Sequence, residues 1–416
     1  MSVQGATTKA LSAIGWRTPL VVVICGCLIS LTSFGPRSSL GFFLAPLSQA
    51  NHWDREVFSM AFAIQNLLWG IGQPLAGGIA DRFGATRVMS VGAICYALGL
   101  ALMAHATTPL SLDISAGVLI GLGLSGCSFG LVIGAFGKLL PAEWRSLAFG
   151  AGTAAGSFGQ FLYSPVGVVL MDKFGWQTAL FIFAGTTMLI LPLSLALATP
   201  RGPAATPAVS LPPQSFRQAM AEAFGHRSYV LLVLGFFTCG FQLAFVTVHL
   251  PSYLVDRGLS AEIGGWTLAT IGLFNIIGSL TSGYLGNRVP KRYILSAIYA
   301  ARALSIAIFI SLPANPLTTI IFGAVTGLLW LSTVPPTSGL VAVMFGTRWL
   351  AMLFGFAFFS HQVGGFLGVW LGGYVFDTYG SYGPVWWLSV FFGVMSALIN
   401  LPIVERPVGE LAPSPA

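Results

Sequence analysis

Residues 77–84 read Gly77-Gly78-Ile79-Ala80-Asp81-Arg82-Phe83-Gly84, and a degenerate copy, Gly283-Tyr284-Leu285-Gly286-Asn287-Arg288, begins 206 residues later. A second pair of segments, Asp172-Lys173-Phe174-Gly175 and Asp377-Thr378-Tyr379-Gly380, is separated by 205 residues. The two pairs share no sequence, yet their spacing is nearly the same. This agreement predicts a chain built from two repeated halves, a plan found among membrane transporters.

The sequence around these repeats is too apolar for a protein surrounded by water. Of its 416 residues, 55% are hydrophobic and 7% are charged, and the mean hydropathy is +0.83. Soluble domains carry about 25% charged residues. Continuous apolar runs of about 20 residues match the thickness of a bilayer and predict helices, whereas barrel strands would alternate. The sequence therefore predicts an all-α membrane protein with twelve transmembrane helices, at 19–47, 57–80, 88–106, 112–136, 147–170, 177–198, 228–253, 264–286, 293–311, 316–343, 350–374 and 384–404.

The longest polar interruption divides these helices into two sets of six. Residues 199–227 are rich in proline and carry several charges, which predicts a linker with a short interfacial helix. We therefore expect an N-terminal six-helix half at 1–198, a cytoplasmic linker at 199–227 and a C-terminal half at 228–416.

The basic residues predict the orientation in the membrane. Fourteen of the nineteen lysines and arginines fall on the side of the two termini, and the outer loops hold three, Arg55, Lys173 and Arg257. The positive-inside rule then places both termini in the cytoplasm, with a bacterial inner membrane as the expected location. The same rule accounts for the net charge of +7, so no nucleic-acid partner is expected. The remaining two cations, Arg37 and Arg302, lie inside apolar runs.

Enzymatic or cofactor-dependent chemistry is not indicated. The five cysteines lie inside apolar runs without metal-ligand spacing, and no loop carries a phosphate-binding or nucleophile motif. We expect no metal, no cofactor and no enzyme activity.

The segment GGIADRFGATR, residues 77–87, resembles the signature loop of the major facilitator superfamily. The matching positions are Gly77, Asp81, Arg82, Gly84 and Arg87, and the degenerate copy after the eighth helix contributes Asn287 and Arg288. The resemblance covers essentially the whole chain. It implies a secondary transporter of twelve helices that binds a small-molecule substrate, acts as a monomer and uses this loop as a gate. The alternative is an ordinary charged turn that only sets topology.

Arg37 is the leading candidate for substrate binding, because burying a charge in a membrane is costly. It lies in FGPRSSLGFFLAPL, which resembles the first helix of monocarboxylate transporters and of the oxalate/formate antiporter group, where a basic residue often stands at this place. By that resemblance Arg37 would hold the carboxylate of a substrate, and a guanidinium suits this task. The alternative is an arginine that extends to the outer membrane interface.

His361 lies in FFSHQVGGFLGVWLGG, which also resembles that group, whose oxalate exchanger has a lysine near this position. An imidazole could carry a coupling proton or bind an anion, and a neutral, hydrogen-bonded histidine is the equal alternative. The chain departs from the proton-coupled carriers in helix eight, where Asn275 and Ser279 replace their Asp and Arg. No acidic residue lies in the middle of any predicted helix, which argues against carboxylate-based proton coupling and against cationic drugs.

Further polar residues in the predicted helices could complete a site near the midplane between the halves. The predicted substrate-binding set is Arg37, Gln65, Asn66, Gln160, Tyr163, Gln242, Asn275, His361 and Gln362. Pro335 and Pro336 predict a kink in the tenth helix. Arg302 could bond to helix ends or lipid phosphate, or reach the cavity.

The function that these residues favour is transport of small organic anions, monocarboxylates or short dicarboxylates, by alternating access. Proton symport and anion exchange both remain open. The alternative is an exporter of drugs or metabolites with the same fold, and a sensor without transport activity is disfavoured by the short tails.

Overall fold

The computed structural model describes residues 16–53, 55–199 and 214–408. These residues form helices and no strands. Ten of the helices are long and apolar enough to cross a membrane, and α4 and α9 are also of spanning length, with 29 and 33 residues. The protein is therefore an integral, multi-pass membrane protein of the predicted all-α class.

The helices group into twelve membrane-length segments within the described residues. The first six are α2 (Pro19–Ser39) with η1 (Leu40–Phe43) and α3 (Leu44–Asn51); α4 (Arg55–Phe83); α5 (Ala85–Met103); α6 (Pro109–Leu112) with η2 (Asp113–Leu119), α7 (Ile120–Cys127) and α8 (Phe129–Leu139); α9 (Ala142–Phe174); and α10 (Trp176–Met188) with α11 (Ile190–Ser194) and η3 (Leu195–Leu197). The last six are α13 (Arg227–Asp256), α14 (Ala261–Leu285), α15 (Lys291–Ser311), α16 (Pro316–Leu329) with α17 (Val334–Phe345), α18 (Leu350–Tyr379) and α19 (Gly383–Asn400).

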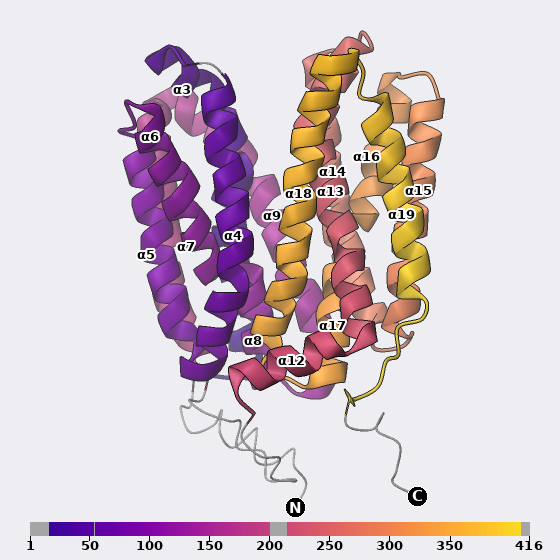
Figure 1. Cartoon of the computed structure of the whole chain (residues 1–416). Helices are drawn as coiled ribbons and strands as arrows, with labels where there is room; N and C mark the ends of the chain where they lie inside the picture. Colours follow the sequence, from indigo (N-terminus) through magenta and orange to yellow (C-terminus); the bar gives the residue numbers. More distant parts are fainter. Residues whose placement is uncertain (1–15, 54, 200–213, 409–416) are drawn as a thin grey trace, which may run out of the picture.

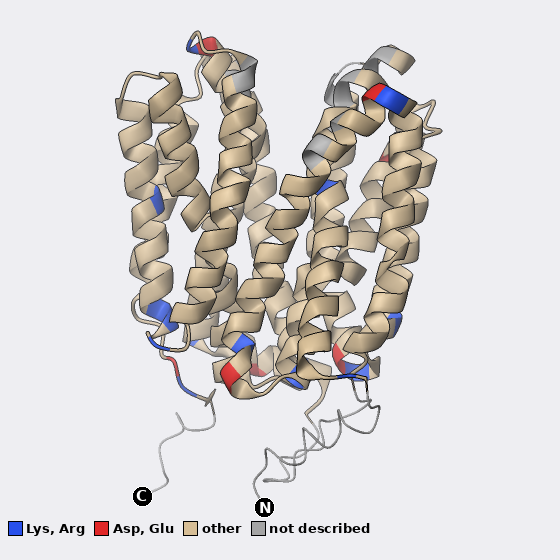
Figure 2. Cartoon of the chain, turned by 180° about the vertical axis from the view of Figure 1, so that it is seen from behind, with Lys and Arg blue, Asp and Glu red and all other residues tan. Residues whose placement is uncertain are grey.

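The segments form two groups that meet at one end of the molecule. We call the groups the N-half (α2 to η3) and the C-half (α13 to α19), and the end at which α2 begins and α19 ends the terminal face (Figure 1). Helices α4 and α18 converge toward the terminal face and diverge toward the opposite face. Figure 2 shows the charged residues gathered at the two ends, with few between them, as a bilayer-spanning bundle requires.

Residues 200–213 of the linker between the halves lie outside the described residues. Its described part contains α12 (Phe216–Gly225), the short helix that the sequence predicts, which lies across the terminal face in Figure 1. Ser215 and Gln218 form a capping box at its start. The Phe216 ring packs edge-on against Trp349 next to the start of α18, so the linker helix lies against the C-half.

Two segments are broken near the middle of the bundle. The tenth breaks at residues 330–333, between α16 and α17, immediately before Pro335 and Pro336, which confirms the predicted kink. The fourth breaks at Ser128, whose extended backbone separates α7 from α8, and no proline marks this break. Sequence reasoning missed it, because the run 112–136 is continuously apolar.

Close packing of glycines joins the halves. A Cβ on Gly77 would lie 2.5 Å from the Ala351 carbonyl oxygen of α18. A Cβ on Gly150 of α9 would lie 3.2 Å from the Cα of Gly283 of α14. The α4–α18 and α9–α14 pairs therefore approach almost backbone to backbone near the terminal face, which only small residues allow.

Candidate substrate-binding site

Arg37 lies half-buried on α2 and turns toward α4 of its own half. Its Nη2 donates to Asn66 Oδ1 at 2.7 Å, and its guanidinium carbon lies 5.8 Å from the centre of the Trp69 ring. The Nε atom is buried without a hydrogen-bond partner. No described carboxylate forms a salt bridge with Arg37, because the salt bridges of the described residues are Lys138–Asp81 and Lys291–Glu405. Arg37 therefore keeps both its charge and a directed donor for another group.

Tyr96 is a neighbour of Arg37 that sequence reasoning missed. It lies on α5, is fully buried and interacts electrostatically with Arg37. The close packing of Gly123 against the Tyr96 backbone brings α5 and α7 together at this level. A tyrosine in an apolar helix gives no periodic or motif signal, so only the tertiary structure could reveal this contact.

A series of aromatic ring contacts connects the Arg37 region to the C-half. Trp69 of α4 lies 4.9 Å from Phe358 of α18, centre to centre, and Phe358 stacks on His361 at 5.3 Å with an interplanar angle of 10°. Phe129 of α8 meets Phe358 edge-on at 5.5 Å. These rings close the space between the halves on the terminal side of Arg37.

His361 and Gln362 carry polar atoms that the described residues do not satisfy. Both ring nitrogens of His361 and the Nε2 of Gln362 are buried without a hydrogen-bond partner. His361 lies between the rings of Phe358 and Phe236, and the Cys239 thiol interacts with it electrostatically. Because buried polar groups are normally paired, these atoms are candidates for contact with polar groups of a ligand.

Three other predicted site residues are engaged by the protein itself. Gln65 donates to the Ala116 carbonyl at 2.8 Å and holds α4 against η2. Asn275 of α14 donates to Ser157 of α9, across the two halves, and accepts from the Leu331 amide at 2.9 Å. Gln242 donates to the Ser389 carbonyl at 2.9 Å. The structure therefore places these three amides as links between helices.

Tyr163 and Gln160 both lie on α9, one turn apart. The Tyr163 ring packs against Gly35 of α2 and meets Phe183 of α10 edge-on, and its hydroxyl hydrogen-bonds to Thr186. Gln160 is half-buried. Tyr163 therefore adjoins the Arg37 region through the backbone of α2.

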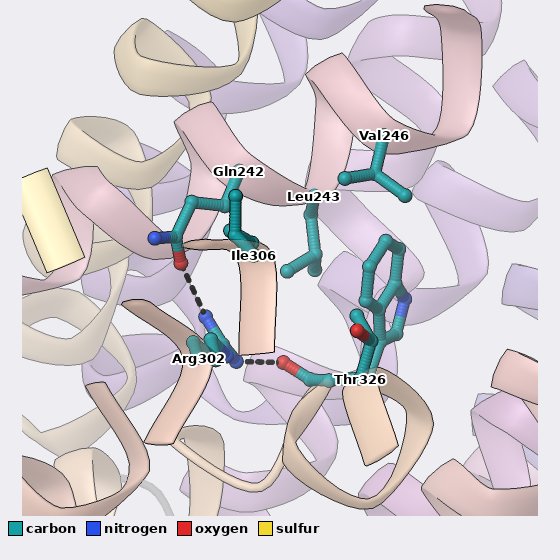
Figure 3. A pocket seen from close by; sticks show the side chains of 7 residues that line it. Gln242, Leu243, Val246, Arg302, Ile306 and Thr326 are labelled. Carbon is teal, nitrogen blue, oxygen red and sulfur yellow. Dashed lines mark hydrogen bonds between the residues drawn. The ribbon is translucent and has the colours of Figure 1, made fainter. Parts of the chain in front are cut away.

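Arg302 is buried in the C-half and binds the end of a broken helix. Its Nε donates to the Leu329 carbonyl at 3.0 Å, Nη2 donates to the carbonyls of Leu329 and Trp330, and Nη1 donates to Gln242 Oε1 at 3.4 Å (Figure 3). These carbonyls belong to the C-terminal end of α16, where the helix dipole is negative. Arg302 is therefore a helix cap, one of the roles that the sequence left open.

The signature loop lies at the terminal face and bridges the halves. Asp81 forms a 2.7 Å salt bridge with Lys138 of α8 and accepts from the Met352 amide of α18 at 3.0 Å. It thus caps the first turn of a helix in the C-half, whose own N-cap residue, Trp349, provides no side-chain cap. Asp81 lies just beyond the predicted span 57–80.

The other residues of this loop and of its copy have separate surroundings. Gly84 adopts φ +99°, which favours glycine, and ends the turn between α4 and α5. Arg82 and Arg87 are exposed. Asn287 donates to the Glu143 carbonyl of the N-half at 3.2 Å, and Arg288 stacks over Tyr284 at 4.4 Å. Both copies of the loop therefore contribute contacts between the halves.

Comparison with known proteins shows which family and which solved structures this chain resembles. The family model described as Major Facilitator Superfamily matches residues 23–368. The fold is similar to crystal structures of the fucose:proton symporter FucP, one from E. coli (TM-score 0.68, 18% identity, 92% of this chain and 98% of that chain) and one in the outward conformation (TM-score 0.69, 17% identity, 91% and 97%).

Curated relatives match along nearly the whole chain. An uncharacterised MFS-type transporter, YcxA of Bacillus subtilis (strain 168), is 30% identical over 388 residues, covering 91% of this chain and 93% of its own. Monocarboxylate transporter 11 of Homo sapiens is 25% identical over 450 residues, covering 96% and 88%, and monocarboxylate transporter 13 of Rattus norvegicus is 25% identical over 377 residues, covering 88% and 84%. With the helical bundle, the signature loop and these matches together, the chain belongs to the major facilitator superfamily of membrane transporters, which are not enzymes.

Proposed function

We propose that this protein carries small monocarboxylate anions across a bacterial inner membrane by alternating access. The observation that carries the proposal is Arg37, a guanidinium inside the bundle with an unpartnered Nε and no carboxylate partner among the described residues. A substrate carboxylate would supply the missing acceptor, and charge-assisted pairs of this kind are stronger than neutral hydrogen bonds.

A single carboxylate suits the site better than two. Arg302, the other cation inside the bundle, already donates to two carbonyls and to Gln242, so it has little left to offer an anion. The unpartnered nitrogens of His361 and Gln362 would take neutral acceptors of the substrate, such as a keto or hydroxyl oxygen. Relatives named monocarboxylate transporters, at 22–25% identity, support the same substrate class.

The transport cycle would alternate the contacts at the terminal face. With the terminal face in the cytoplasm, this structure corresponds to an arrangement closed toward the cytoplasm. Opening would separate Asp81 from Met352, Gly77 from Ala351 and Trp69 from Phe358, with the N-half (1–198) and the C-half (228–416) rocking as units.

Uptake of radiolabelled organic acids into proteoliposomes tests the proposal. We expect saturable uptake of a monocarboxylate and a loss of about 10-fold to 100-fold in kcat/KM for Arg37→Gln, because a hydrogen bond to a charged group is worth about 1.5–3 kcal/mol. Arg37→Lys keeps the positive charge but loses the planar pair of guanidinium donors, so its kcat/KM should lie between those of the parent and of Arg37→Gln.

The same assay separates the mechanisms. Stimulation by an inward proton gradient indicates symport, and stimulation by internal acid indicates exchange. Full transport of every acid by Arg37→Gln, or no uptake of any acid even into preloaded vesicles, would reject the organic-anion proposal and lead to tests of drug and metabolite export.

A further inference from the structure

A basic pocket opens on the terminal face of the C-half, away from the substrate site. It has a volume of about 550 Å³ and lies between the turn that follows α14 and the segment that follows α19. Its lining residues are Gly286, Asn287, Arg288, Val289, Pro290, Lys291, Arg292, Val343, Val404, Glu405 and Arg406. We refer to the pocket lined by these residues as the basic pocket.

The charge of the basic pocket is strongly positive. It contains four cations and a single acid, Glu405. Glu405 is occupied by Lys291, whose Nζ and backbone amide both lie 2.7 Å from its carboxylate oxygens. The described residues therefore leave three guanidiniums, those of Arg288, Arg292 and Arg406, without a carboxylate partner.

Two of these guanidiniums are held in place. Arg288 stacks over Tyr284 at 4.4 Å, and Arg292 stacks over Tyr293 at 4.6 Å and donates to the Ile403 carbonyl at 3.1 Å. The Nε of Arg292 is buried without a hydrogen-bond partner. A fixed guanidinium with an unused donor is well suited to phosphate oxygens, which it can bind in a planar, two-pronged manner.

The rim of the basic pocket is apolar and faces outward. The rings of Tyr284 and Tyr293 are 49% and 46% exposed, and Leu285, Val289 and Val404 expose more than a third of their surface. Exposed tyrosines next to arginines at the end of a spanning helix are typical of the boundary between headgroups and acyl chains. A free phosphate would satisfy the cations but would leave this rim uncovered.

We propose that the basic pocket binds the phosphate headgroup of an anionic phospholipid. The phosphate contacts Arg288, Arg292 and Arg406, and the acyl chains run along Tyr284, Leu285 and the exposed side of α14. Basic pockets at the cytoplasmic ends of membrane helices recognise anionic headgroups through this combination of charge and apolar surface.

The location of the pocket connects lipid binding to the state of the carrier. The same turn carries Asn287, which donates to the Glu143 carbonyl of the N-half. The Ser146 hydroxyl of the N-half donates to the Gly283 carbonyl of α14 at 2.6 Å. A lipid that orders this turn binds more tightly while these contacts are formed. By linkage, it then stabilises the arrangement that is closed at the terminal face.

Native mass spectrometry of the full-length protein, titrated with dioleoylphosphatidylglycerol or dioleoylphosphatidylcholine, tests the proposal. The test variant is Arg288→Gln/Arg406→Gln, which leaves Arg292 to hold Ile403. The matched control is Arg217→Gln/Arg227→Gln, which removes two exposed cations outside the pocket. We expect one phosphatidylglycerol to bind the parent at least tenfold more tightly than phosphatidylcholine, and the test variant to lose at least fivefold of that affinity while the control keeps it.

Three results would overturn the proposal. Equal loss in the control would mean that the lipid responds to the general surface charge. Displacement by 10 mM inorganic phosphate would mean a site for a soluble anion, and equal binding of the two lipids would mean no headgroup recognition. None of these readings requires substrate, so the lipid site and the monocarboxylate proposal can fail independently.

Discussion

The arginines inside the bundle show how surroundings assign different roles to the same side chain. Arg302 donates hydrogen bonds to the carbonyls at the C-terminal end of α16 and to the Gln242 side chain. Arg37 meets one amide oxygen and an aromatic face, and one of its donors remains unused. A guanidinium whose hydrogen-bond donors have partners in the protein stabilises the fold, and one with an unused donor can bind a ligand.

Removal of Arg302 should destabilise the carrier without removing its substrate site. Arg302→Ala removes the guanidinium donors of the Leu329 and Trp330 carbonyls, at about 1–3 kcal/mol for a carbonyl that finds no other donor. We expect a lower melting temperature in detergent, with partial recovery in Arg302→Lys and on addition of guanidinium ion, which fits the vacated space. An unchanged melting temperature would contradict the capping role.

Tyr96 should contribute to substrate affinity through its hydroxyl. Tyr96→Phe keeps the packing of α5 but removes the polar group beside Arg37. We expect KM to rise by about 3-fold to 10-fold, as the loss of one neutral hydrogen bond of about 1 kcal/mol predicts. Tyr374→Phe, on an exposed tyrosine of α18, is the control, and equal KM values for parent and Tyr96→Phe would exclude this role.

At the scale of elements, the broken tenth segment is satisfied by side chains of other helices. Arg302 of α15 takes the carbonyls of Leu329 and Trp330, Asn275 of α14 takes the Leu331 amide, and Ser282 of α14 donates to the Ser332 carbonyl. A break inside a membrane is tolerated only when its backbone groups find such partners. Asn275 also reaches Ser157 of the N-half, so the break is linked to the contact between the halves.

The glycine contact between α9 and α14 should control how closely the halves meet. In Gly150→Val the new side chain would collide with the α14 backbone near Ser279 and Gly283. We expect the equilibrium to shift toward opening at the terminal face, seen as faster labelling of a cysteine placed at that contact in a background without native cysteines.

Gly185→Val provides the matched control for this variant. A Cβ at Gly185 meets no atom within 4 Å, so the same substitution should leave the labelling rate at its parent value. Equal effects of the two variants would mean that helix propensity, and not the contact between the halves, governs the result.

At the scale of the whole molecule, the contacts between the halves lie on the terminal side of the candidate site. Gly77, Asp81 and Trp69 of α4 meet Ala351, Met352 and Phe358 of α18, respectively. A rocking movement that opens the terminal face must break these contacts, because each of them joins α4 of the N-half to α18 of the C-half.

A covalent link across this contact should therefore stop transport. We expect Trp69→Cys/Phe358→Cys, whose parent side chains meet across α4 and α18, to lose its remaining uptake when cross-linked by a short thiol reagent with a reducible spacer, in a background without native cysteines. Reduction should restore uptake, and each single cysteine variant should be unaffected by the reagent. Continued transport by the fully cross-linked protein would exclude rocking about the α4–α18 contact.

The sequence by itself determined the helical membrane class, the kink at Pro335 and Pro336, the short helix in the linker and the family. These properties depend on composition, on run length and on motifs that lie within one segment, which a linear chain displays directly. It also indicated Arg37 as a charge that would need a special environment.

Only the tertiary structure decided which polar residues remain free for a ligand. Gln65, Asn275 and Gln242 are amides inside apolar runs, as Gln362 is, but their side chains donate hydrogen bonds to residues 51, 118 and 147 positions away in the chain. The same holds for Tyr96 beside Arg37, for the break at Ser128, and for the cap that Asp81 provides to α18. Each depends on a neighbour from another helix, and hydrogen-bond satisfaction is a property of the packed bundle that no local stretch of sequence contains.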